Sequence, residues 1–155
     1  MTVIITGMSG FAGVHLARLL LKKGLNPSPL LFEGSRVDIR DAETVSRAVK
    51  EISPAGIYHL AAKSGIGQSW KDPDLFYSVN VQGTRNLLQA ALEHTPKARV
   101  VMVSTGSVYG NAAPDKTIKE EDRAEPQNPY AETKLEAEMA CMEFRDKGLD
   151  VRRAR

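Results

Sequence analysis

The chain has 155 residues, of which 42% are hydrophobic and 26% charged, and its formal net charge is +2. This composition is typical of one globular domain, and so small a charge does not indicate binding to nucleic acid or to an anionic membrane. The single cysteine excludes an internal disulfide, and the cysteine and the three histidines show no metal-ligand spacing. The chain opens on an apolar run without a basic leader and has no apolar stretch that would span a bilayer. We therefore expect a cytoplasmic location and no metal, nucleic-acid or membrane partner.

Short apolar runs alternate with helical patterns, which predicts an α/β fold: a doubly wound parallel sheet with flanking helices. The expected strands are residues 3–5, 30–32, 36–39, 56–60, 99–103 and 149–155. The expected helices are residues 11–23, 41–52, 73–94 and 131–147, with Asp41 as the N-cap of the second. Residues 114–129 are polar and interrupted by prolines, so a loop is expected there.

A G-x-x-G-x-x-G run joins the first strand to the first helix through Gly7, Gly10 and Gly13. In dinucleotide-binding folds, the first glycine permits the tight turn, the second lets the backbone approach a pyrophosphate, and the third allows close helix–strand packing. The helix N-terminus adds unpaired N–H groups and a partial positive charge. Such a run also occurs in unrelated turns, but its position directly after a strand favours a dinucleotide site.

Six motifs resemble, in order, those of the extended short-chain dehydrogenases/reductases, the NAD-dependent epimerase/dehydratase family that acts on sugar nucleotides. They are Thr6-Gly7-x-x-Gly10-Phe11-x-Gly13, Asp38-Ile39-Arg40-Asp41, His59-Leu60-Ala61-Ala62, Asn80-Val81-x-Gly83-Thr84, Ser104-Thr105-Gly106-Ser107-Val108-Tyr109-Gly110 and Tyr130-x-x-x-Lys134. The resemblance covers nearly the whole chain and implies a Rossmann domain over residues 1–155 that binds NAD or NADP. Members of this family typically continue for about as long again. The resemblance therefore also implies that a C-terminal substrate-binding part is absent.

The resemblance implies that Thr105, Tyr130 and Lys134 are catalytic. Tyr130 and Lys134 lie four residues apart and so share one face of a helix. Because an ammonium beside a phenol favours the ionised phenol, the pair could transfer a proton at a sugar hydroxyl or carbonyl while hydride moves to or from nicotinamide. Thr105 would hydrogen-bond the same oxygen.

The cofactor-binding residues that the resemblance implies lie in the glycine run, after the third expected strand, after the fourth, and in the catalytic pair. They are Gly7, Ser9, Gly10, Phe11, Ala12, Gly13, Asp38, Ile39, Leu60, Ala61, Ala62, Lys63, Tyr130 and Lys134. Asp38 is expected at the adenine. His59 is expected to be a satisfied core residue, and Asn80 to cap the long helix in preference to anchoring a water molecule.

Two departures from the family pattern bear on the reaction. Gly106 and Ser107 stand where family dehydratases commonly carry at least one carboxylate, so a 4,6-dehydratase is disfavoured. The short segment before Asp38 resembles that of the NDP-4-keto-6-deoxyhexose reductases, which makes such a reductase the expected function. An NDP-sugar 4-epimerase uses the same Thr, Tyr and Lys and remains an alternative. A non-catalytic dinucleotide-binding sensor or scaffold is an alternative of another class, since a fold does not settle function.

Cofactor choice depends on the segment around the second expected strand. Glu33 lies 20 residues after Gly13, about where an acidic residue would bind the ribose 2′-hydroxyl of NAD. Ser35 and Arg36 follow it and could instead receive a 2′-phosphate. Reductases that resemble this chain mostly use NADPH, so NADP is expected. The resemblance also implies a homodimer through the helices at residues 80–94 and 131–147.

Overall fold

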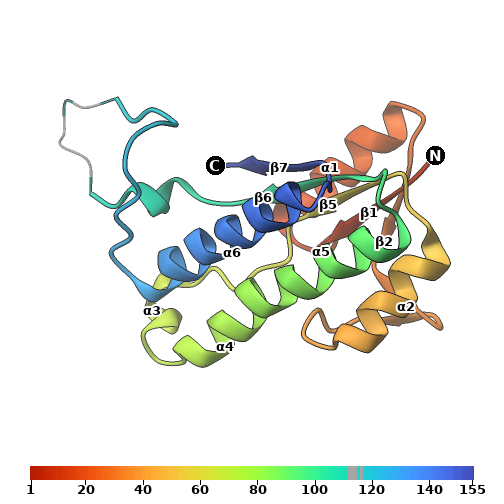
Figure 1. The fold of residues 1–155 in the computed structure, drawn as a ribbon, viewed down its shortest axis with the longest axis horizontal. Helices are drawn as coiled ribbons and strands as arrows, with labels where there is room; N and C mark the ends of the chain where they lie inside the picture. Colours follow the sequence, from red (N-terminus) through yellow and green to blue (C-terminus); the bar gives the residue numbers. More distant parts are fainter. Residues whose placement is uncertain (112–114, 116) are drawn as a thin grey trace.

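The computed structural model describes residues 1–111, 115 and 117–155, and it contains a five-stranded parallel sheet flanked by helices (Figure 1). The strands, in spatial order, are β2 (Asn26–Pro29), β1 (Thr2–Thr6), β5 (Gly56–His59), β6 (Arg99–Val103) and β7 (Val151–Ala154). Pro114 and Lys116, which belong to the loop expected over residues 114–129, lie outside the described residues, while residues 117–128 contain no helix or strand.

The strand order places β1 between β2 and β5, so the chain leaves β1 toward one side of the sheet and later returns to its other side. This reversal is the topological switch point of a doubly wound sheet, and ligands bind in the crevice at the carboxyl ends of the strands there. The predicted α/β doubly wound fold is confirmed.

Helices cover the two faces of the sheet unequally. On one face α1 (Phe11–Lys22) packs Ala17 and Leu20 against Val3 and Ile5. On the other face α2 (Ala42–Ile52), α5 (Gly83–His94) and α6 (Pro129–Asp146) enclose the larger core, and α5 and α6 run side by side in Figure 1. Successive side chains of β1 therefore alternate between the two cores, as a strand buried on both faces requires.

Two of these helices begin at side-chain caps. The carboxylate of Asp41 accepts a hydrogen bond from the N–H of Thr44 at 3.1 Å, which confirms the predicted N-cap of α2. The side chain of Asn128 accepts from the N–H of Ala131 at 2.9 Å, and Pro129 follows as the first residue of α6. Because proline fits the first helical position, α6 begins two residues before the predicted 131. No helix of the described residues is both long and apolar enough to cross a membrane.

The helix expected over residues 73–94 is present as one continuous helical stretch. It consists of α4 (Pro73–Tyr77), the π-helical turn η1 (Ser78–Gln82) and α5, and a short helix α3 (Ile66–Ser69) precedes it. The turn η1 packs against α6. Single π-turns inside helices are frequent at functional sites.

The segment between α1 and α2 differs from the prediction. The second strand is residues 26–29 rather than 30–32, and the third sheet strand expected at 36–39 does not form. Instead β3 (Leu31–Phe32) and β4 (Ser35–Arg36) make a separate antiparallel hairpin, whose turn residues Glu33 and Gly34 both have positive φ, 49° and 76°. Such two-residue turns match the strand twist. The strand 26–29 contains two prolines, and it tolerates them because β2 is an edge strand with β1 as its one sheet neighbour.

Candidate active site

The turn between β1 and α1 brings backbone close to backbone. Gly7 has φ +71°, and a Cβ there would lie 2.8 Å from the nitrogen of Ala61 in the loop after β5. A Cβ on Gly13 would overlap the carbonyl oxygen of Gly7 and lie 2.6 Å from the Cα of Met8. The first turn of α1 carries no acidic side chain that would oppose an anion. This cradle, into which side chains do not fit, suits a pyrophosphate at the N-terminus of a helix.

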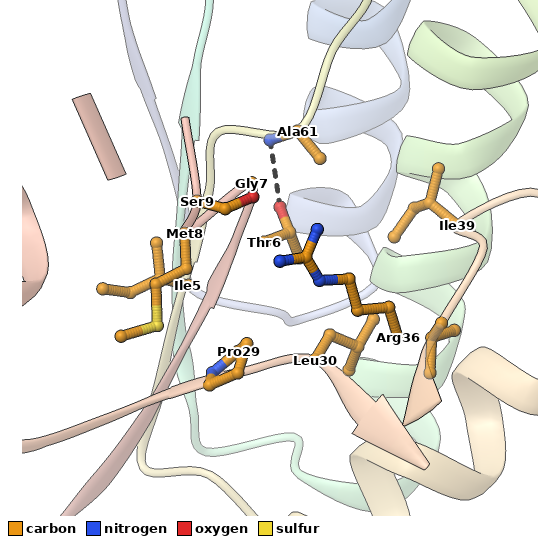
Figure 2. A pocket seen from close by; sticks show the side chains of 11 residues that line it. Ile5, Thr6, Gly7, Met8, Ser9, Pro29, Leu30, Arg36, Ile39 and Ala61 are labelled. Carbon is orange, nitrogen blue, oxygen red and sulfur yellow. Dashed lines mark hydrogen bonds between the residues drawn. The ribbon is translucent and has the colours of Figure 1, made fainter. Parts of the chain in front are cut away.

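A cavity of about 400 Å³ opens beside this turn, at the switch point of the sheet. Its walls come from the end of β1, the glycine turn, the end of β2, the hairpin and the loop after β5. They are lined by Ile5, Thr6, Gly7, Met8, Ser9, Pro29, Leu30, Arg36, Val37, Ile39 and Ala61. Figure 2 shows the Arg36 guanidinium extended over the cavity toward Thr6 and Gly7. A mostly apolar cavity with a cation at its rim fits the adenosine half of a dinucleotide.

Eleven of the fourteen predicted cofactor residues form two groups around this cavity, while Asp38 lies beside it and Tyr130 and Lys134 lie on α6, outside its walls. Gly7, Ser9, Ile39 and Ala61 line it. The remaining residues of the glycine turn and of the loop after β5 adjoin those that line it but are not themselves in its walls. They are Gly10, Phe11, Ala12, Gly13, Leu60, Ala62 and Lys63. The contacts predicted for these residues stay predictions.

Asp38, expected at the adenine, lies beside the cavity and is paired within its own loop. Its carboxylate accepts two hydrogen bonds from Nε of Arg40, at 3.0 and 3.1 Å, and forms an ion pair with Nη2 at 2.5 Å. These bonds lower the pKa of Asp38 to about 2. Glu33, the alternative ligand for a ribose hydroxyl, is exposed at the hairpin tip and does not line the cavity, whereas Arg36 does.

The elements that carry the three residues predicted to be catalytic, α6 and the start of η2, come together at the carboxyl end of β6. Tyr130 and Lys134 lie on successive turns of α6, and Nζ of Lys134 donates to the carbonyl oxygen of Val103 at 2.7 Å. Thr105 follows two residues later as the N-cap of the 3₁₀ turn η2 (Gly106–Tyr109), where its hydroxyl oxygen accepts from the N–H of Ser107 at 3.2 Å. The ammonium of Lys134 and the hydroxyl of Thr105 therefore lie at the carboxyl end of β6, and Tyr130 lies one turn before Lys134 on the same helix.

Lys134 is buried, with 3% of its surface exposed. Burial lowers the pKa of this lysine to about 8, and electrostatic interactions with Cys141 and with the carboxylate of Glu138 partly oppose the shift. The group therefore stays protonated at neutral pH but loses its proton far more readily than a surface lysine. A buried ammonium that can still titrate is suited to assist proton transfer at a neighbouring phenol.

His59 connects the glycine turn to the long helix. Nδ1 lies 2.6 Å from the hydroxyl of Thr6, and Nε2 lies 2.9 Å from the hydroxyl of Thr84. Because Thr84 already donates to the carbonyl of Asn80, we assign the proton of the ring to Nε2. Burial, together with the charge of Lys134, lowers the pKa of His59 to about 3, so the ring is neutral. The prediction of a satisfied core histidine is confirmed.

Asn80 is not a helix cap, so that prediction is wrong. The helix starts seven residues earlier, where Asp72 caps the N–H of Leu75 at 3.1 Å, and Asn80 is buried inside η1. Its amide accepts from the N–H of Lys63 at 2.8 Å and donates to the carbonyl of Lys63 and the hydroxyl of Thr133, both at 3.0 Å. Asn80 thereby ties the loop beside the cavity to α6, which carries Tyr130 and Lys134.

Among the described residues, no group of three or more His, Cys, Asp or Glu side chains is placed to hold a metal ion. Two features of the site were not predicted. The apolar wall formed by Pro29 and Leu30 was not predicted because the second strand was placed at residues 30–32. Glu138, which lies one helical turn beyond Lys134, was not identified because no motif includes it.

The chain is similar in sequence to known enzymes that act on nucleotide sugars. The sequence profile described as GDP-mannose 4,6 dehydratase matches residues 4–152. GDP-6-deoxy-D-mannose reductase of Pseudomonas aeruginosa is 34% identical over 143 residues, which cover 92% of this chain and 46% of that protein. The chain thus spans about half the length of the curated relatives it matches.

Two solved structures have the same fold with different dinucleotides. UDP-glucose 4-epimerase of Thermus thermophilus, in complex with NAD, superposes with a TM-score of 0.87 at 31% identity, covering 96% of this chain and 52% of that one. The protein RMD of Pseudomonas aeruginosa, complexed with NADPH, gives a TM-score of 0.87 at 32% identity, covering 99% and 53%.

Proposed function

This chain belongs to the extended short-chain dehydrogenase/reductase family of NAD-dependent epimerases and dehydratases, and from that membership we propose that it is the dinucleotide-binding part of an oxidoreductase acting at carbon 4 of a nucleotide sugar. The reaction that we propose is reduction of an NDP-4-keto-6-deoxyhexose. The observation that carries this proposal is that α6, which bears Tyr130 and Lys134, is joined through Lys134 to the end of β6 just before Thr105, in a chain whose glycine turn and cavity fit a dinucleotide.

In the proposed reaction, each of the three candidate catalytic residues has a separate role. A nicotinamide dinucleotide held at this site would supply the hydride. The hydroxyl of Tyr130 gives its proton to the sugar oxygen as the carbonyl becomes an alcohol, and the hydroxyl of Thr105 hydrogen-bonds the same oxygen. The ammonium of Lys134, which now donates to the carbonyl of Val103, stabilises the phenolate that remains. The glycine turn and the walls around Arg36 hold the dinucleotide in place.

A 4-epimerase is the second candidate, because it needs the same three side chains and because a UDP-glucose 4-epimerase is among the similar structures. A dehydratase is less suited, since Gly106 and Ser107 in η2 offer no carboxylate for removing a proton from carbon 5. A non-catalytic sensor would not need the buried lysine beside a tyrosine that this chain retains.

The relatives are about twice as long as the matched segment, which supports the proposal that the nucleotide sugar is held by chain other than residues 1–155. We also propose that two copies pair across α5 and α6, where Met139 and Met142 are exposed on α6.

We expect the complete enzyme to oxidise NADPH when given an NDP-4-keto-6-deoxyhexose, and to form no 4-keto-6-deoxy product from an NDP-hexose and NAD. The 155-residue chain alone should bind dinucleotide by calorimetric titration but turn over no nucleotide sugar, because a substrate that is not oriented forfeits roughly 7–11 kcal/mol of barrier lowering. Mass spectrometry of the products decides the reaction. Loss of water from the hexose would contradict the argument from Gly106 and Ser107, and interconversion of UDP-hexoses without consumption of NADPH would establish the epimerase instead.

We propose NADP as the preferred cofactor, on the position of Arg36 at the rim of the adenosine cavity (Figure 2). Arg36→Ala should weaken NADPH binding by about tenfold to a hundredfold, as expected for loss of a charge-assisted contact, and leave NADH binding nearly unchanged. Arg47→Ala, which removes an exposed arginine from the neighbouring α2, is the matched control. Titration calorimetry with both cofactors tests this. If the unmodified chain binds NADH more tightly than NADPH, and if Arg36→Ala leaves both affinities unchanged, the proposed preference for NADP is overturned.

A further inference from the structure

Glu138 is a buried carboxylate on α6, one turn beyond Lys134, with 1% of its surface exposed. Its Oε1 accepts a hydrogen bond from the hydroxyl of Ser104 at 2.5 Å. Its two oxygens accept three hydrogen bonds from Arg155, at 2.6, 3.0 and 3.1 Å, and Oε2 also pairs with Arg153 at 3.3 Å. Neither the proposed proton transfer nor the proposed dinucleotide contacts use this group.

Burying a carboxylate costs free energy unless charges and hydrogen bonds replace the lost water. Burial raises the pKa of Glu138, but hydrogen bonds from Arg155 and Ser104 and the charges of Arg155 and Arg153 outweigh it, and the pKa lies below its usual value. Glu138 is therefore ionised. A carboxylate so fully paired holds three elements together: α6, the end of β6 through Ser104, and β7 with the residue after it through Arg153 and Arg155.

The helix α6 thereby holds the end of β6 at two consecutive residues. Lys134 donates to the carbonyl of Val103, and one turn later Glu138 accepts from the side chain of Ser104. The backbone N–H of Ser104 also donates to the carbonyl of Ala154 in β7, at 2.6 Å. Thr105 comes next in the chain. Since Tyr130, Lys134 and Glu138 recur every four residues, they lie on one face of the helix, and that face contacts the end of β6 through Lys134 and Glu138.

We propose that Glu138 is a positioning residue of the candidate active site, which fixes Ser104, and through it Thr105, against the face of α6 that carries Tyr130 and Lys134. This inference rests on the proposed function for its catalytic meaning. Two contacts extend the effect. Arg155, held by Glu138, donates to the hydroxyl of Tyr109 at 2.5 Å and lies over its ring, 4.9 Å from the centroid, so the far end of η2 is fixed as well. The negative charge of Glu138 also opposes the loss of the proton from Lys134.

Nuclear magnetic resonance of the isotope-labelled 155-residue chain tests the inference without requiring turnover. The variants are Glu138→Gln, which removes the charge, Ser104→Ala, which removes the hydrogen bond but keeps the ion pairs, and Glu136→Gln, the matched control on the exposed side of α6. The readouts are hydrogen exchange of the Ser104 and Thr105 amides and the titration of the Lys134 ammonium. Cys141 also acts on Lys134, and Lys134 in turn acts on His59. These two residues and Tyr130, the phenol that we propose Lys134 serves, are the same in every variant.

We expect exchange at Ser104 and Thr105 to rise about tenfold or more in both Glu138→Gln and Ser104→Ala, beyond any change in the rest of the sheet. The titration midpoint of Lys134 should fall by about half a unit or more in Glu138→Gln and stay in place in Ser104→Ala. Glu136→Gln should change neither. If Glu138→Gln fails to fold, Ser104→Ala alone decides.

The melting temperature could instead fall while local exchange and the Lys134 titration remain as in the unmodified chain. Glu138 would then contribute only a structural ion pair, and the proposal would be overturned. In the complete enzyme, Ser104→Ala should lower kcat about tenfold with KM and dinucleotide binding retained. If the unmodified enzyme turns over no nucleotide sugar, the proposed function fails, while the resonance measurements still decide whether Glu138 positions Thr105.

Discussion

In the complete enzyme, Tyr130→Phe is expected to lower turnover of the nucleotide sugar by about 10²–10⁴-fold, the contribution of a positioned general acid or base. At 1.36 kcal/mol per tenfold change, this corresponds to about 2.7–5.4 kcal/mol of barrier height. The substitution removes one oxygen and keeps the ring, which packs edge-on against Phe76 with the centroids 6.5 Å apart. The helix and the dinucleotide site should therefore stay intact, and NADPH affinity should change little. Steady-state kinetics and calorimetric titration of the same variant measure the two effects separately.

Tyr77→Phe is the matched control, because it makes the same chemical change at a tyrosine of α4 that is about half exposed. We expect it to leave turnover and cofactor affinity unchanged. If the Tyr130→Phe enzyme keeps near-normal turnover, Tyr130 takes no part in the reaction. The main argument for an oxidoreductase of this type would then be lost. A loss of NADPH binding that matches the loss of turnover would instead assign the tyrosine to cofactor binding alone.

The parts of the fold that were predictable are those in which local pattern and tertiary structure agree. Strand β6 combines β-branched residues with burial, and α2 begins at a capping aspartate, so the sequence signals both. The segment from Asn26 to Arg36 gives the opposite signals. Its sheet strand contains Pro27 and Pro29, while two of its apolar residues, Leu31 and Phe32, pair in a hairpin outside the main sheet. An edge position in the sheet decides this, and an edge is a property of topology that no local pattern encodes.

Residues of the candidate site could be predicted where they occupy a position of a known motif. They could not be predicted where their role depends on contacts that form only in the folded chain. Tyr130, Lys134 and Thr105 follow from motif positions, and the structure brings the elements that carry them to one end of the sheet. The amino-acid sequence of α6 does not distinguish Glu138 from Glu136. In the structure Glu138 is buried against Ser104 and Arg155, whereas Glu136 is exposed. The π-turn that buries Asn80 was not predicted either, because the sequence was interpreted as one regular helix over residues 73–94.

The second large effect is expected at the glycine turn. In Gly13→Ala the added methyl group would overlap the carbonyl oxygen of Gly7 and lie 2.6 Å from the Cα of Met8. Both neighbours are backbone atoms, so the turn itself has to move, and overpacking of this kind costs about 1–3 kcal/mol. Because the turn is the proposed pyrophosphate cradle, we expect the dissociation constant of the dinucleotide to rise by about tenfold to a hundredfold. Calorimetric titration of the 155-residue chain measures this directly.

Gly67→Ala separates this steric effect from the general effect of replacing a glycine. Gly67 lies within α3, and a Cβ there would meet nothing within 4 Å. Alanine is favoured over glycine inside a helix by roughly 0.5–1 kcal/mol, so this control should bind dinucleotide normally and melt no lower than the unmodified chain. For Gly13→Ala, far-ultraviolet circular dichroism should still report a folded α/β domain, since Gly13 contacts the turn and not the main core. Unchanged dinucleotide affinity in a folded Gly13→Ala chain would mean that the dinucleotide does not bind at this turn, and the proposed oxidoreductase function would then lose its cofactor site.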